Sequence, residues 1–254
     1  MSSNRHLLHF PVIIPPMQQN LVFFDTETTG NLKTDRLCQI AYKRGTETFE
    51  SLYKPPIPIS VESSSICHIT NKMIAGKPLF KEAPEYTDIK NLFESTETIP
   101  VAHNAVFDVN ILANEDIAIP HFICTMRVAR HLDPDGKIPR YSLQFLRYFL
   151  EIEVEGTAHD ALGDVMVLEK LFERLQKKIM ETDSCDESAA IVKMLEISSH
   201  PTLLKKINFG KYKDSLVADL AQQDPGYLQW LLTEKKKGDT LDEDWIYTLE
   251  YYLK

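Results

Sequence analysis

Cysteine is scarce in this sequence: its 254 residues contain four, at Cys38, Cys67, Cys124 and Cys185. They lie far apart and form no CxxC pair, so neither a zinc cage nor a disulfide framework is predicted. No apolar run approaches the roughly 18 residues of a membrane span. Residues 1–20 lack the basic start and the cleavage site of a signal peptide. We therefore expect an N-terminal arm over 1–20, reduced thiols, a cytoplasmic location and no membrane partner.

Positive charge is also in short supply, because 28 Lys and Arg face 37 Asp and Glu, for a net charge of −9. A chain of this charge does not bind nucleic acid by bulk attraction. A nucleic-acid enzyme is still compatible with it, since an acidic metal site adds negative charge and basic patches can be local. The length suits one large domain, or one domain with a small appendage, at roughly 100–200 residues per domain.

Short apolar runs and helical periodicities alternate over the first 180 residues, which predicts an α/β fold with a mixed sheet flanked by helices. Strands are expected at 21–24, 36–45, 46–55 and 98–103, and from residue 122. Helices are expected as two short pieces within 61–78 and at 83–94, from 105, from 126, and at 142–150, 160–180, 189–197 and 245–253. The helix over 160–180 has a core-facing stripe of Ala161, Val165, Leu168, Phe172, Leu175 and Ile179.

Two acids follow the first strand, in the stretch LVFFDTETTG. Asp25 and Glu27 point to the same face because side chains alternate along a strand. Two carboxylates buried side by side are costly without a counter-charge, and their hard oxygens suit Mg²⁺ or Mn²⁺. The alternative is a pair of exposed acids at a strand end. Gly30 lets the chain turn away after them.

Two later segments add further groups of this kind. In HNAVFDVNIL, Asp108 lies one turn into a helix among apolar neighbours. In HDALGD, His159 precedes a helix, and Asp164 lies one turn inside it at the border of the inward-facing stripe. Four carboxylates and one histidine suggest a two-metal phosphodiester hydrolase. His159 has an unperturbed pKa of about 6.5 and could take the proton from the attacking water.

The stretches FFDTETTG, HNAVFDVNIL and HDALGDV resemble, in this order, the three motifs of the DEDDh family of 3′→5′ exonucleases. This resemblance covers residues 21–180 and implies a ribonuclease-H-like fold and two Mg²⁺ or Mn²⁺ ions. It implies that Asp25 bridges both ions, that Glu27 and Asp164 hold the nucleophile-side ion, and that Asp108 serves the other. His159 would be the general base.

The sister class of this family has a tyrosine four residues before the last aspartate, where this chain has Asp160, so the histidine class is favoured. The resemblance also makes Thr28, His103, Asn104 and Phe107 candidates for contact with the terminal nucleotide. Alternatives stay open for two of them: Asn104 could cap the following helix, and Phe107 could pack in the core.

The stretches CTMRVARHLDPD, YSLQFLRYFL and FGKYKDSLVADLAQQDPGYLQWLL resemble the exodeoxyribonuclease X branch and its small C-terminal module. Asp214 stands where this module usually has glycine, a departure expected to alter a turn. The expected organisation is an exonuclease domain over 21–181, a linker and helix over 182–198 and the module over 199–254. Within the module we expect a tight turn at Gly210 and a charged surface loop at 234–244.

The module also carries a local group of lysines and aromatic residues: Lys205, Lys206, Phe209, Lys211, Tyr212 and Lys213. It could contact phosphates and bases, or its aromatic residues could pack in a small core. A contact between the module and a protein is the other possibility.

The resemblance implies that the substrate is a nucleic-acid 3′ end, with DNA favoured over RNA and single strands over duplexes, and that nucleoside 5′-monophosphates are released. One alternative is a 3′→5′ exoribonuclease that trims RNA. An alternative of another class is a non-catalytic nucleic-acid-binding or docking protein that keeps the fold.

Overall fold

The computed structural model describes residues 20–154, 161–238 and 242–254 of the chain. The expected arm therefore lies outside the described residues, apart from Asn20, and so do His159 and Asp160. No helix among the described residues is both long and apolar enough to cross a membrane. The cytoplasmic location stays a prediction.

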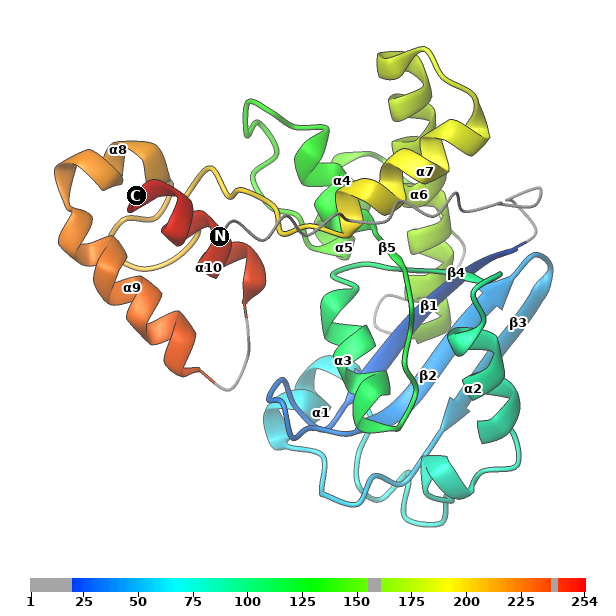
Figure 1. The fold of residues 1–254 in the computed structure, drawn as a ribbon. Coiled ribbons are helices and arrows are strands. Elements are labelled where there is room, and N and C mark those ends of the chain that lie inside the picture. The colour runs from blue at the N-terminus through cyan, green and yellow to red at the C-terminus, as the bar shows by residue number, and fades with distance from the viewer. Residues whose placement is uncertain (1–19, 155–160, 239–241) are drawn as a thin grey trace, which may run out of the picture.

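A five-stranded mixed sheet forms the centre of the larger lobe, in the order β3-β2-β1-β4-β5 (Figure 1). Its strands are β1 (Leu21–Thr28), β2 (Leu37–Arg44), β3 (Glu47–Leu52), β4 (Ile99–Ala102) and β5 (Ile123–Cys124). Strand β2 is antiparallel to both β1 and β3, whereas β1, β4 and β5 run parallel to one another. The predicted mixed sheet is confirmed, and the expected strands at 36–45 and 46–55 form a hairpin that turns at Gly45.

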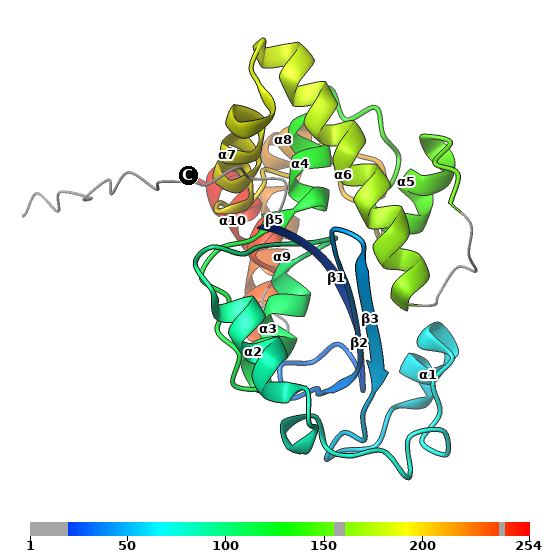
Figure 2. The ribbon, with the colours of Figure 1, turned by 90° about the vertical axis from the view of Figure 1, so that its right-hand side faces the viewer.

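Helices cover both faces of this sheet (Figure 2). Side chains alternate along β1, so Leu21 and Phe23 join one apolar core and Val22 and Phe24 join the other. The first core contains residues of α4 (Thr125–His131), α5 (Leu143–Phe149), α6 (Ala161–Asp183) and α7 (Glu187–Ser198). The second contains residues of α2 (Tyr86–Glu94) and α3 (Val106–Asn114). All six residues of the stripe predicted on α6 are buried.

Strand β1 is longer than its apolar run predicts, because its pairing with β2 continues through Asp25 and Glu27. The two acids therefore lie inside the strand and not beyond its end. On the other side of β1, β4 pairs only with the segment 21–23 and ends at Ala102. The last part of the central strand is thus left with an open edge, and this edge positions the site described below.

Two local expectations differ from the structure, and a third position lacks one bond. The segment 61–78 contains one helix, α1 (Val61–Cys67), followed by turns. Asn104 does not cap α3 with its side chain: it has a φ of +62°, and its carbonyl accepts a hydrogen bond from Phe107 N at 2.9 Å. Ser142 occupies the N-cap of α5 but makes no side-chain capping bond.

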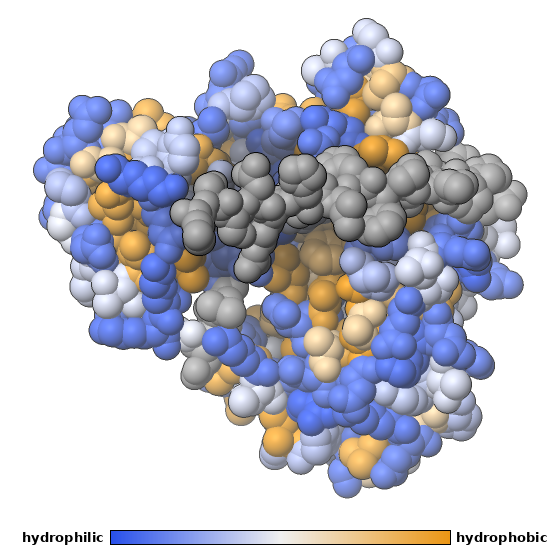
Figure 3. Space-filling view, in the orientation of Figure 1, coloured by the Kyte–Doolittle hydropathy of each residue, from blue (hydrophilic) through white to orange (hydrophobic). Residues whose placement is uncertain are grey.

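The C-terminal module forms a second lobe beside the sheet (Figure 1), and the space-filling view shows it with a largely hydrophilic outer surface (Figure 3). Its helices are α8 (Val217–Gln223), α9 (Pro225–Lys237) and α10 (Glu243–Tyr252). They enclose a separate core of Ile207, Val217, Leu220, Leu228, Leu231, Leu232, Trp245 and Leu249. Phe209 and Tyr212 pack against this core, as one of the two sequence interpretations has it.

The prediction of a surface loop at 234–244 is wrong for much of this segment. Helix α9 continues to Lys237 and α10 begins at Glu243. The turn at Gly210 is confirmed by its φ of +63°. Asp214 adopts a φ of +69°, a left-handed conformation that glycine takes freely and that aspartate tolerates better than most residues.

Four charged residues attach the module to α4, and we call them the ion-pair cluster: Arg127, Arg130, Glu243 and Asp244. Arg127 is 4% exposed and pairs with Glu243 at 3.0 Å and with Asp244 at 3.2 Å. Arg130 donates to the other oxygen of Asp244. Because three of the four side chains are largely removed from water, this contact depends on complete pairing.

Candidate active site

Asp25 and Glu27 extend the row of Leu21 and Phe23 on the face of β1 that α6 covers. Both acids are partly buried, whereas Thr26 and Thr28 between and after them are buried on the opposite face. This arrangement follows from the two-residue period of a strand, as the sequence predicts. The two carboxylates therefore lie side by side beneath the first turn of α6.

Two further carboxylates reach the same place from different elements. Asp164 lies in the first turn of α6 and Asp108 in the first turn of α3. Asp108, which is 3% exposed, closes the open edge of β1: its Oδ1 accepts hydrogen bonds from Thr26 N at 3.2 Å and Thr26 Oγ1 at 2.6 Å. The early end of β4 leaves this N–H available to Asp108.

The four carboxylates act electrostatically on one another. Burial, followed by the charges of Asp108, Glu27 and Asp164, raises the pKa of Asp25 well above its usual range. Burial and the charges of Asp164 and Asp108 raise the pKa of Glu27 to about 7. The pKa of Asp108 also rises to about 7, because burial outweighs its hydrogen bonds from Thr26. Burial and mutual repulsion are both unfavourable for ionised carboxylates, and a bound cation would offset both.

The chemistry of these donors suits a hard divalent cation, which prefers carboxylate oxygens. Within the described part of the chain, however, no three His, Cys, Asp or Glu side chains are gathered into a metal-ligand set. Like charges repel each other, and two of the acids are held by neighbouring side chains, Asp108 by Thr26 and Asp164 by Gln144. The donor types and the mutual repulsion fit a metal site, and a bound ion would draw the carboxylates together.

Two residues that contact the acids were missed by the sequence interpretation. Gln144 on α5 donates from Nε2 to Asp164 Oδ1, and its buried Oε1 has no hydrogen-bond partner among the described residues. Thr26 holds Asp108 across 82 positions of sequence. The alternation of β1 indicates the direction of Thr26 but not its partner, and no sequence signal marks Gln144.

His103 makes two hydrogen bonds inside the protein. Its Nε2 lies 2.6 Å from the carbonyl oxygen of Tyr141, and its Nδ1 lies 2.8 Å from Thr125 Oγ1. Burial lowers its pKa to about 4, so the ring is neutral. Because a carbonyl can only accept, Nε2 carries the proton and Nδ1 accepts from Thr125. Both ring nitrogens are occupied within the protein, so His103 holds the backbone before α5, and its contact with a nucleotide stays a prediction.

The other three candidates for nucleotide contact lie in different surroundings. Thr28 is buried, and its hydroxyl donates to the carbonyl of Gly30 at 2.5 Å. Asn104 is exposed, and Phe107 is half-buried against the core of α2 and α3. Asn104 and Phe107 both line a cavity beside α3. His159 lies outside the described residues, and its role stays a prediction.

The turn after the acids depends on Gly30 for a steric reason. Asp35 accepts hydrogen bonds from Thr29 Oγ1 at 2.5 Å and from Leu32 N at 2.6 Å, which fixes the loop between β1 and β2. A Cβ atom on Gly30 would lie 2.5 Å from Asp35 Oδ2. Glycine thus permits the close approach that directs the chain away from the carboxylates.

Two models of known protein families match this chain. The family model described as Exonuclease matches residues 22–172, and the model described as Exodeoxyribonuclease X-like C-terminal matches residues 207–236. The chain belongs to the exonuclease family. It is an exonuclease with the X-like C-terminal module, and its mixed sheet flanked by helices agrees with a ribonuclease-H-like fold. Exonucleases of this family generally depend on a divalent metal.

Several relatives of this exonuclease are known. It is 32% identical to "Exodeoxyribonuclease 10" of Escherichia coli (strain K12) over 205 residues, which is 80% of this chain and 83% of the relative. It is 32% identical to "DNA polymerase III subunit epsilon" of Treponema pallidum (strain Nichols) over 162 residues, 59% of this chain and 73% of the relative. The solved structure of Exonuclease X in complex with 5′ overhanging duplex DNA matches with a TM-score of 0.54 and 28% identity, covering 70% of this chain and 99% of that chain.

The raised pKa of Glu27 predicts how stability depends on pH without metal. The folded state keeps a proton that the unfolded chain loses between pH 4.5 and about 7, so this group lowers stability as pH rises through that window. In the variant Glu27→Gln, the side chain at this position cannot ionise. Its advantage over the wild type should therefore grow from near zero at pH 4.5 to at most about 3 kcal/mol at pH 8.

Thermal unfolding in EDTA at several pH values measures this difference. His103 has a lowered pKa and contributes the opposite slope below pH 6.5 in both proteins, so it cancels in the comparison. A difference that shrinks or stays constant as pH rises would refute the assignment of Glu27 to a repulsive acid cluster.

Proposed function

We propose that this exonuclease removes nucleotides from DNA 3′ ends, with single strands preferred and duplex ends as further substrates, and that two Mg²⁺ or Mn²⁺ ions assist it. The observation that carries this proposal is the convergence of four mutually repelling carboxylates from β1, α3 and α6. The names of the relatives, an exodeoxyribonuclease and a structure with duplex DNA, favour DNA as the substrate. The products would be nucleoside 5′-monophosphates.

In this proposal Asp25, Glu27, Asp108 and Asp164 would hold the ions, and Asp25 would serve both of them. When bound, the ions supply a nucleophile at neutral pH and stabilise the leaving oxygen. His159 takes the proton of the attacking water. The catalytic unit comprises residues 21–181, with 182–198 as a connecting helix and 199–254 as the module.

Gln144 acts in this scheme as a positioning residue. Its amide N–H donates to one oxygen of Asp164 and so fixes the orientation of that carboxylate. His103 supports the same region, since it holds the carbonyl of Tyr141 at the residue before the N-cap of α5, the helix that carries Gln144. Asn104 and Phe107 are the side chains next to Asp108 that are accessible to a terminal nucleotide.

The experiment that tests this function is a time course on 5′-labelled single-stranded DNA and on RNA of the same sequence, in Mg²⁺ or in EDTA. We expect a ladder that shortens from the 3′ end of DNA and is lost in EDTA, since the carboxylates alone cannot activate water. A ladder on RNA alone would show that the substrate is RNA and that the enzyme is a 3′→5′ exoribonuclease. Absence of cleavage, with binding that ignores metal, would overturn the proposed activity in favour of a binding protein.

A further inference from the structure

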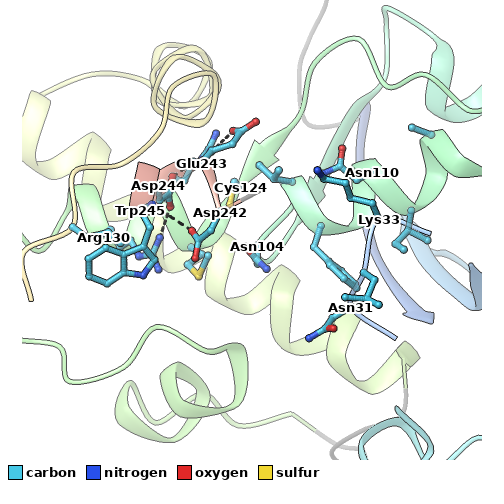
Figure 4. Close-up of a pocket in the computed structure, with 18 of the residues that line it drawn as sticks. Asn31, Lys33, Asn104, Asn110, Cys124, Arg130, Asp242, Glu243, Asp244 and Trp245 are labelled. Atoms are coloured by element: carbon cyan, nitrogen blue, oxygen red, sulfur yellow. Dashed lines mark hydrogen bonds and ion pairs between the residues drawn. The ribbon is translucent and has the colours of Figure 1, made fainter. Parts of the chain in front are cut away.

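A cavity of about 610 Å³ lies between the module and the catalytic unit, and we call it the module cleft. Figure 4 shows Asn104 between its two walls, with Asn31, Lys33 and Asn110 on one wall and Asp242 and Trp245 on the other. Its volume falls in the roughly 300–1,000 Å³ range of pockets that hold small organic ligands. The module therefore encloses space beside the catalytic unit as well as packing on it.

The module cleft lies next to the proposed active site along α3. Phe107 lines the cleft, and its neighbour Asp108 is turned toward Thr26 at the edge of β1. Asn104, which precedes this helix, also lines the cleft. A strand whose 3′ end lies at the carboxylates would therefore find the cleft close by on the module side of α3.

The lining is rich in free amide groups. The side chains of Asn31, Asn104, Asn110 and Asn208 all line the cleft and make no hydrogen bond with any described residue. Each amide offers two donors and one acceptor, which can pair with the edges of an unpaired nucleobase. Asn110 comes from α3 and Asn208 from the module, so both walls contribute.

The charges of the lining disfavour a track of phosphates. Three cations and three anions line the cleft: Lys33, Arg127, Arg130, Asp242, Glu243 and Asp244. Arg127 and Arg130 are already neutralised in the ion-pair cluster, whereas Lys33 makes no ion pair within the described residues. A single available cation suits one phosphate, and a nearly neutral amide-rich surface suits a base.

We propose that the module cleft binds one unpaired nucleotide of the substrate strand, with its base held by Asn110 and Asn208 and its phosphate by Lys33. This inference rests on the proposed function and assigns the module a role in holding the strand that is being shortened. It predicts that the enzyme binds a long strand more tightly than a dinucleotide, which has only one nucleotide beyond the 3′-terminal one to offer the cleft.

The test compares KM for a 5′-labelled 12-nucleotide single-stranded DNA with KM for a dinucleotide. The ratio of interest is KM for the 12-nucleotide DNA divided by KM for the dinucleotide. In the double variant Asn110→Leu with Asn208→Leu this ratio should rise about tenfold, as expected for two lost hydrogen bonds. The matched control is Asn91→Leu, an exposed asparagine of α2 away from the cleft, for which the ratio should equal that of the wild type.

A second measurement identifies the bound nucleotide. Single abasic sites are placed at successive positions from the 3′ end, and affinity is measured by fluorescence anisotropy in EDTA. In the wild type, an abasic site at one position should lower the affinity for the DNA about tenfold. In the double variant, an abasic site at that position should leave the affinity unchanged. The inference would be overturned if the KM ratio of the double variant stays within twofold of the wild-type ratio and no abasic site lowers the affinity. Metal-dependent shortening of DNA by the wild type would still support the proposed function in that case.

Discussion

Asp25→Ala is expected to lower the rate of DNA cleavage by at least about a thousandfold while leaving the protein folded. Asp25 is the acid on which the other three carboxylates all act, and its pKa is raised by their charges. Its removal takes away the ligand proposed to be shared by both ions. It also relieves repulsion, so the melting temperature in EDTA at pH 8 should equal or exceed that of the wild type.

The matched control is Asp88→Ala, which removes an exposed aspartate in the first turn of α2. It should keep wild-type cleavage and lose at most about 1 kcal/mol of stability, because an acid near a helix N-terminus is modestly favourable. Single-turnover cleavage in Mg²⁺ and unfolding in EDTA supply both readouts. Wild-type turnover in Asp25→Ala would show that the chemistry lies elsewhere.

Asp244→Ala should cost about 3–5 kcal/mol of stability, the largest loss that we expect from one side chain outside the apolar cores. The Asp244 carboxylate pairs with Arg127 and Arg130 and accepts from Thr202 N at 2.9 Å. Without it, the buried guanidinium of Arg127 keeps only the more exposed Glu243 as a counter-charge. A loss of this size corresponds to a fall in melting temperature of roughly 6–20 °C.

The neighbouring Glu243→Ala provides the contrast. Glu243 pairs with the same Arg127 but is 49% exposed, so its removal should cost about 1 kcal/mol or less. Chemical denaturation of both variants, read by fluorescence, compares them directly. Equal and small losses would mean that the module is not attached to α4 through Asp244.

The faces of three of the four proposed metal ligands could be predicted because they depend on local periodicity. Asp25 and Glu27 share a face through the two-residue period of a strand, and Asp164 borders the α6 stripe through helical spacing. Contacts between distant segments carry no such signal. The hydrogen bonds from Thr26 to Asp108 and from Gln144 to Asp164 depend on where β4 ends and how α5 packs.

The alternative that Asn104 caps α3 failed for a related reason. Asparagine before a helix commonly caps it, but Asn104 lies two residues after the end of β4 and takes a left-handed conformation in the turn that leads into α3. The predicted loop after residue 234 failed because its charged composition resembles a surface loop. In the structure these charges pair with partners, such as Asp242 with Lys235 at 2.9 Å, that sequence order alone does not bring together.

The spacing of the ion-pair cluster along the chain has a consequence for synthesis of the protein. Arg127 and Glu243 are 116 positions apart, and both α6 and α7 are translated between them. A nascent chain whose sheet is already complete must therefore wait for α10 before Arg127 gains its carboxylates. Until then its guanidinium has the carbonyl of Ser198 at 2.8 Å as an uncharged acceptor once α7 is made. A chain that ends between α7 and α10 would thus keep on α4 an arginine without its carboxylate partners.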